Sequence, residues 1–66
     1  MEITLNGKTR DIQDGISVQE LLDQMRIDCM QVVVEHKQLI IPRQRLAETF
    51  LSNGDSLEVI HFVGGG

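Results

Sequence analysis

The sequence predicts an α+β fold in which one main helix packs on one face of a mixed sheet of four or five strands. Two local signals support this prediction. Asn6-Gly7 separates two strand-like segments, and this dipeptide favours a hairpin because a type I′ turn needs positive φ at both central residues. Ser17 and Glu20 have capping-box spacing before an apolar stripe, which indicates a helix start. One helix covers one face of a sheet, so the other face is expected to lack a helix.

Residues 1–12 predict the hairpin. Residues 1–5 alternate between apolar and polar side chains, as a half-buried strand does, and residues 8–12 form the returning strand. A two-residue turn gives the pairs Leu5 with Lys8, Ile3 with Arg10 and Met1 with Ile12. This register puts Lys8 and Arg10 on the face of the core residues. Either their stems cover the core edge while their charges reach water, or the loop is longer than two residues.

The predicted helix runs from about Val18 to Arg26. Ile16 and Leu21 occupy the positions of a hydrophobic staple around the capping box. The apolar residues at i, i+3, i+4 and i+7 are Val18, Leu21, Leu22 and Met25. A single apolar stripe of this kind predicts a helix that lies flat on the sheet.

The second half of the chain predicts three more strands. Residues 31–35 contain three β-branched valines, and residues 39–41 form a short strand that Pro42 ends. Residues 35–38 turn the chain between these two strands. One or two irregular helical turns are expected within residues 43–51, and the alternating residues 57–62 form the last strand.

The last strand is expected to pair in parallel with the first, in the middle of the sheet. Val33, Ile60 and Phe62 would then lie on the face without a helix, as an exposed apolar patch. Such a patch beside a chain end more often marks a protein contact than a folding error. Phe62 in particular is expected to dock a partner.

The chain ends Val63-Gly64-Gly65-Gly66. Glycines pack no side chain and lose the most backbone entropy on ordering, so this ending adds no stability. Four extended residues span about 13 Å and could deliver a carboxylate through a channel too narrow for a Cβ atom; the alternative is a frayed end. We therefore divide the chain into one domain, residues 1–62, and a flexible C-terminal tail, residues 63–66.

Composition excludes several functional classes. A chain of 66 residues can form one core but leaves no room for a deep active site of its own, which argues against an autonomous enzyme. Its 10 acidic and 6 basic residues give a net charge of −4 without a basic cluster, so nucleic acids and membrane surfaces are poor partners. No apolar run reaches the roughly 20 residues of a membrane helix, and no signal peptide is recognisable. A cytoplasmic protein is expected.

Other reactive side chains have plainer interpretations. Cys29 could accept sulfur, but a lone cysteine is more often a small buried hydrophobic residue. His36 and His61 lie in different elements without further ligands at metal-binding spacing, so no metal site is expected. Asp55 is interpreted as a turn residue. Met25 and Met30 are expected in the core and at its edge.

Several segments together resemble the ThiS family of sulfur carriers in thiamin biosynthesis, which has the β-grasp, or ubiquitin-like, fold. They are Ile40-Ile41-Pro42-Arg43, Asn53-Gly54-Asp55, Leu57-Glu58-Val59-Ile60 and Val63-Gly64-Gly65-Gly66. The Asn6-Gly7 turn and the helix start at Ser17 also match, so the resemblance covers essentially the whole chain. The chain departs from many relatives at Glu35-His36-Lys37, where they have an asparagine-containing turn, and near Leu46, where they often have an aromatic residue.

The resemblance implies chemistry at the carboxyl group of Gly66. A ThiF-like enzyme would adenylate this group with ATP and magnesium, and sulfur from a cysteine desulfurase-derived persulfide would then give a thiocarboxylate. Thiazole synthase, a ThiG-like enzyme, would receive the sulfur. Gly64 and Gly65 would thread the tail, and Val33, Ile60, Phe62 and Val63 would bind partners. The chain itself would hold no cofactor and would be a monomer when free.

Two related functions remain as alternatives. The small subunit of molybdopterin synthase shares the fold and the tail chemistry, but its family usually has a longer chain and a proline-containing approach to the glycines. A ubiquitin-like modifier would instead join its tail to a lysine. A purely structural domain with a frayed end predicts that removing Gly65 and Gly66 leaves function intact.

Overall fold

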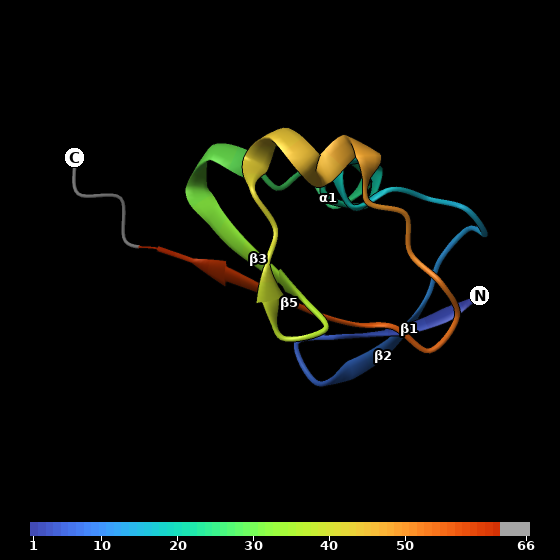
Figure 1. Ribbon diagram of the computed structural model, residues 1–66. Helices are drawn as coiled ribbons and strands as arrows, with labels where there is room; N and C mark the ends of the chain where they lie inside the picture. The colour runs from blue at the N-terminus through green and yellow to red at the C-terminus, as the bar shows by residue number, and fades with distance from the viewer. Residues whose placement is uncertain (63–66) are drawn as a thin grey trace.

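The computed structural model describes residues 1–62. Five strands form one sheet, and a helix and two short 3-10 helices connect them (Figure 1). The strands are β1 (Glu2–Leu5), β2 (Lys8–Asp11), β3 (Val32–His36), β4 (Leu39–Ile40) and β5 (Ser56–His61). The helices are α1 (Val18–Gln24), η1 (Cys29–Gln31) and η2 (Arg43–Glu48).

The strand order is β2-β1-β5-β3-β4, so β5 lies in the middle of the sheet. It runs parallel to β1 and antiparallel to β3. The helices gather on one side of the sheet, as Figure 1 shows. The prediction of a parallel first and last strand at the centre of a mixed sheet is therefore confirmed.

The first hairpin has the predicted register, with Ile3 opposite Arg10 and Leu5 opposite Lys8. Asn6 and Gly7 both have positive φ, 51° and 82°, as a type I′ turn requires. Because β2 is an edge strand and all four of its side chains are exposed, Lys8 and Arg10 reach water. The turn does have two residues, and the longer loop is not needed.

Asn6 also continues the pairing of β1 with β5. Its backbone N–H donates to the carbonyl of Leu57 at 2.9 Å. Its side-chain Oδ1 then accepts from the N–H of Val59 at 2.8 Å, and its Nδ2 donates to the carbonyl of Val59 at 3.3 Å. The side-chain amide of Asn6 therefore takes the place that the next peptide group of β1 would occupy beside β5. It satisfies both the N–H and the carbonyl of Val59.

The capping box forms as predicted. Ser17 Oγ accepts from the N–H of Glu20, and Glu20 Oε1 accepts from the N–H of Ser17, both at 3.1 Å. The predicted end at Arg26 was wrong by two residues, because α1 ends at Gln24. Arg26 has a φ of 58° and donates to Asp23, while Ile27 donates to Leu22. This is the Schellman arrangement, with arginine in the left-handed position that glycine usually takes.

The core lies between the sheet and the helical side. Val18, Leu21 and Leu22 of α1 are buried, as is Leu46 of η2. They join apolar residues of β1, β3 and β5 in one cluster, completed by Ile3, Leu5, Ile16, Val32, Val34, Leu51, Leu57 and Val59. Met25 and Cys29 are partly buried and pack against the cluster. The expectation that Met30 lies at the core edge was wrong, since its side chain is 55% exposed.

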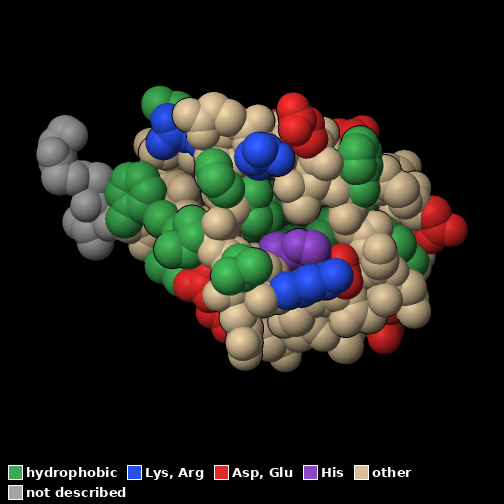
Figure 2. All heavy atoms as spheres, in the orientation of Figure 1, with side chains coloured by type: hydrophobic (Ala, Val, Ile, Leu, Met, Phe, Trp, Pro, Cys, Tyr) green, Lys and Arg blue, Asp and Glu red, His purple; other side chains and the backbone are tan. Residues whose placement is uncertain are grey.

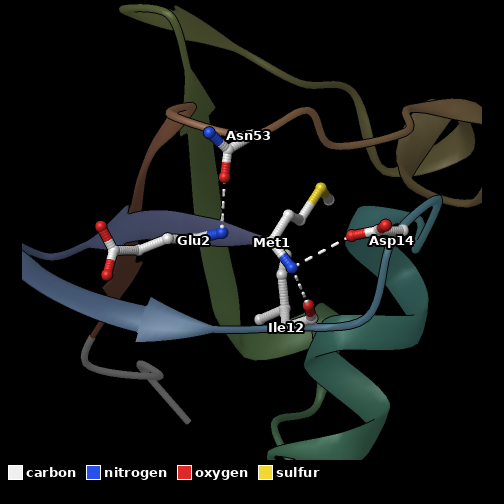
Figure 3. Close-up of polar contacts among 5 residues, drawn as sticks. All are labelled: Met1, Glu2, Ile12, Asp14 and Asn53. Atoms are coloured by element: carbon white, nitrogen blue, oxygen red, sulfur yellow. Dashed lines mark hydrogen bonds and ion pairs between the residues drawn. The ribbon is translucent and has the colours of Figure 1, made fainter.

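The start of β1 is tied to the turn that precedes β5 (Figure 3). The N–H of Glu2 donates to Asn53 Oδ1 at 2.8 Å, and the N–H of Gly54 donates to the carbonyl of Glu2 at 2.7 Å. The amino nitrogen of Met1 contacts the carbonyl of Ile12 at 2.8 Å and Asp14 Oδ1 at 3.0 Å. These contacts hold β1 and β5 in place at one end of the sheet. They thereby fix the position of the strand whose other end leads to the tail.

Candidate functional site at the end of the central strand

The candidate site is the end of β5, from which the C-terminal tail leaves the domain. β5 pairs with β3 from Leu57 opposite His36 to His61 opposite Val32. The N–H of Phe62 still donates to the carbonyl of Gln31, at 3.3 Å. The backbone is therefore held by hydrogen bonds up to the last described residue. The predicted tail residues Val63, Gly64, Gly65 and Gly66 lie outside the described residues.

The structure places the three described residues of the predicted partner surface together. Val33 is half-buried on β3 and lies directly opposite Ile60 of β5. Ile60 is 45% exposed, and Phe62, two residues further, is 46% exposed. None of these side chains belongs to the buried cluster, although Leu57 and Val59 of the same strand do. A role of this patch in docking stays a prediction.

Two exposed apolar residues next to this patch were missed by sequence reasoning. Leu39 and Ile40 form the edge strand β4 and are 73% and 64% exposed. The pattern predicted a strand here, and apolar residues in a strand are ordinarily taken to be buried. Their exposure could have been inferred from the shortness of the strand and from Pro42 shortly after it, because very short strands and prolines are typical of sheet edges. In Figure 2, apolar side chains extend from the end of the molecule that carries the tail across this face.

His36 and Asp55 form a largely buried pair that the sequence did not reveal. His36 Nε2 lies 2.8 Å from Asp55 Oδ2, and the two side chains are 14% and 9% exposed. Asp55 Oδ2 also accepts from the N–H of Ser52 at 2.9 Å, which agrees with its predicted role as a turn residue. Burial alone would raise the pKa of Asp55. Hydrogen bonds from His36 and Ser52 and the charges of His36 and Lys37 outweigh burial, so its pKa is lowered.

The described residues contain no second cluster of reactive groups. Across residues 1–62, no three His, Cys, Asp or Glu side chains gather in a way that could hold a metal ion. Cys29 packs at the core edge, and His61 is exposed at the end of β5. Within the same range, no helix is long and apolar enough to cross a membrane.

Comparison with known proteins agrees with this geometry. The model of the ThiS family matches residues 3–66, which is nearly the whole chain and includes the glycine tail. The chain belongs to the ThiS family. A crystal structure of the thiamine biosynthesis protein ThiS from Geobacter metallireducens superposes with a TM-score of 0.87, at 30% identity and full coverage of both chains. The predicted β-grasp fold and the predicted family are both confirmed.

Two kinds of similar protein bear on the function. The sulfur carrier protein ThiS of Bacillus subtilis is 37% identical over 65 residues, which cover 97% of this ThiS-family chain and 98% of that protein. A thiazole synthase of Paramagnetospirillum magneticum is 33% identical over all 66 residues, yet this chain spans only 20% of its length. A thiazole synthase of Magnetococcus marinus shows the same proportions at 32% identity. A ThiS-like segment thus occurs alone and within thiazole synthase chains.

Family membership also orders the alternatives. It places this chain with the sulfur carriers of thiamin biosynthesis, the first of the functions considered from the sequence.

Proposed function

We propose that this chain carries sulfur as a thiocarboxylate on Gly66 and donates it to thiazole synthase for thiamin biosynthesis. The observation that supports the proposal best is the extent of the family match. It continues through residue 66 and so includes the tail whose terminal carboxyl group would react. The chain is then a substrate that is charged and discharged, and the catalysts are its partners.

The carboxylate needs activation because it is anionic at neutral pH, with an ordinary pKa of roughly 3.3–3.7. A ThiF-like enzyme that uses ATP and magnesium would join a carboxylate oxygen of Gly66 to the α-phosphorus of ATP, and pyrophosphate would leave. The terminal sulfur of a persulfide, supplied through a cysteine desulfurase, would then attack the acyl carbon and displace AMP. A thiol would cleave the resulting acyl disulfide, leaving the thiocarboxylate on Gly66 and a new disulfide between the two thiols.

The residues of this chain would position the carboxyl group of Gly66 and would not catalyse its reactions. The ladder between β3 and β5 fixes the chain up to Phe62, and four fully extended residues beyond this point could span about 13 Å. The absence of side chains on Gly64 and Gly65 lets a partner enclose the backbone closely. Val33, Ile60 and Phe62 offer the apolar contact surface beside the tail, and Val63 would extend it.

Intact-protein mass spectrometry tests the proposal. The full chain is incubated with the adenylating enzyme of the same organism, ATP, magnesium, a cysteine desulfurase and cysteine. We expect the mass to increase by the difference between one sulfur and one oxygen atom, with the change located at Gly66 by fragmentation. An unchanged mass, under conditions that charge the B. subtilis carrier, would refute the proposal.

A shortened chain without Gly65 and Gly66 is the matched control. Both residues follow the described domain, so the fold should keep its thermal stability. The shortened chain should gain no sulfur, because its carboxyl group no longer reaches the adenylating centre. Equal sulfur incorporation in both chains would show that the length of the tail does not matter and would contradict the role given to Gly64 and Gly65.

A further inference from the structure

Positive charge in this acidic chain is concentrated in one segment. Residues 36–47 contain Lys37, Arg43 and Arg45, which are three of the six Lys and Arg residues, and no Asp or Glu. The net charge of the whole chain is −4. Both arginines are exposed on η2, and neither forms an ion pair with another described residue. This segment thus has a charge opposite to that of the whole chain.

The same segment lines two adjoining hollows, which we call together the β4–η2 groove. The first has a volume of about 350 Å³, and its lining includes His36, Leu39, Arg45 and Thr49. The second has about 210 Å³, and its lining includes Arg43 and Phe62. Ile40, Ile41 and Pro42 line both. In Figure 2, histidine, cationic and apolar side chains gather beside one another on this face.

The groove combines apolar contact area with uncompensated cations. Leu39 and Ile40 are the most exposed large apolar side chains among the described residues, at 73% and 64%. They lie on an edge strand, whose outer backbone groups have no neighbouring strand among the described residues. Because Phe62 lines the second hollow, the groove is continuous with the patch from which the tail leaves. A partner that holds the tail would come into contact with this groove.

We propose that the β4–η2 groove docks an acidic and apolar segment of thiazole synthase; this inference rests on the proposed function. The acidic character follows from Arg43 and Arg45, and the apolar character from Leu39 and Ile40. Thiazole synthase is chosen because two proteins of that name contain a segment like this chain within their own length. In such chains the two parts are held together permanently.

The other edge of the sheet offers a matched comparison. β2 carries Lys8 and Arg10, and both are exposed. It also carries Asp11 and has no exposed large apolar residue. Replacing two cations by glutamate on either edge changes the net charge of the chain by the same amount. The comparison therefore separates a docking site from a general effect of net charge.

The test measures binding of the full chain to thiazole synthase of the same organism by calorimetry. R43E/R45E should raise Kd at least about tenfold, while K8E/R10E should change it less than about threefold. L39S/I40S should weaken binding without lowering Tm by more than a few degrees, since both side chains are exposed. Amide resonances of residues 39–45 should shift on complex formation, and those of residues 8–11 should not.

Equal effects of the two charge reversals, or none from either, would overturn the proposal. A wild-type chain that does not bind thiazole synthase would overturn it too. A fourth outcome is that the chain's own terminal carboxylate occupies the groove. Removing Gly65 and Gly66 would then shift the resonances of residues 39–45 in the free chain. This result would refute thiazole synthase as the occupant. Sulfur incorporation at Gly66, measured on the same preparations, shows separately whether the proposed function holds.

Discussion

Asp55 shows how one side chain can determine the arrangement of two loops. It is only 9% exposed, and the same oxygen, Oδ2, contacts His36 from the end of β3 and the N–H of Ser52 in the turn before β5. The carbonyl of Asp55 accepts from Thr4 of β1 at 2.8 Å. Asp55 therefore connects the three central strands at the end of the sheet that is remote from the tail.

The lowered pKa of Asp55 gives a prediction for stability in acid. A carboxyl group whose folded pKa lies below its ordinary value of 3.8 stabilises the fold fully above that value. This contribution is lost as the pH falls through the folded pKa. D55N should therefore lower the free energy of unfolding by about 1–2 kcal/mol at neutral pH. The difference from wild type should shrink below pH 3.8, as measured by urea unfolding across a pH series.

D11N is the control for this prediction. Asp11 is exposed on β2 and accepts no side-chain hydrogen bond from a described residue. D11N should match wild type within about 0.5 kcal/mol at every pH. If D55N and wild type keep the same stability difference down to the most acidic pH at which both fold, the pKa of Asp55 is not lowered in the folded state.

At the scale of elements, the sequence predicted those features that depend on residues close together in the chain. The capping box follows from the spacing of Ser17 and Glu20, and the first turn follows from Asn6-Gly7. The end of α1 was missed because arginine, not glycine or asparagine, takes the left-handed position at Arg26. The exposure of β4 was missed because it depends on strand order and not on local apolar character.

The candidate site likewise has features that depend on neighbouring residues and features that depend on the tertiary structure. The chemistry at Gly66 stays a prediction, which rests on the consecutive glycines of the tail and on the family resemblance. The pair of His36 and Asp55 could not be predicted, because its members are 19 residues apart and meet only when β3 and β5 pair. The groove was also missed, because it forms where η2 packs beside β4 and no local motif marks it.

The second hairpin offers a test at this scale. Lys37 and Gln38 connect β3 and β4 with φ values of 54° and 69°, so both residues adopt a conformation that costs an L-residue roughly 1–2 kcal/mol. Glycine adopts it freely. Q38G should therefore raise the free energy of unfolding by about 0.5–1 kcal/mol, despite the greater entropy of the unfolded chain. Urea unfolding at neutral pH measures the change.

Q44G is the matched control, since Gln44 is exposed in η2 and does not have positive φ. Glycine there should destabilise the fold by up to about 1 kcal/mol, because only the entropic cost applies. Opposite signs for the two variants would support a strained turn at Gln38. A loss of stability in both would show that the conformation of Gln38 costs little in this protein.

For the whole molecule, the predicted partner patch lies at one end of a sheet that is fixed at the other. Contacts of Glu2 with Asn53 and Gly54 hold one end of β1 and β5, as Figure 3 shows for Asn53. Phe62 and Ile60 lie at the opposite end of β5, and the β4–η2 groove extends from His36, beside the start of β5, to Phe62. This separation allows surface residues near the tail to change without loss of the fold, because they add little to the buried cluster.

Phe62→Ala tests this separation. Phe62 is 46% exposed and lies outside the buried cluster, so its truncation should lower the free energy of unfolding by less than about 1 kcal/mol. The same change should weaken binding to thiazole synthase about tenfold or more, because an aromatic side chain beside the reacting tail has the properties of an interface hot spot.

Phe50→Ala is the control, since Phe50 is 60% exposed and its backbone bridges to Ser17 at the start of α1. It should leave binding unchanged. Equal binding by the two variants, or a loss of more than about 3 kcal/mol of stability in Phe62→Ala, would show that Phe62 serves the fold and not the partner.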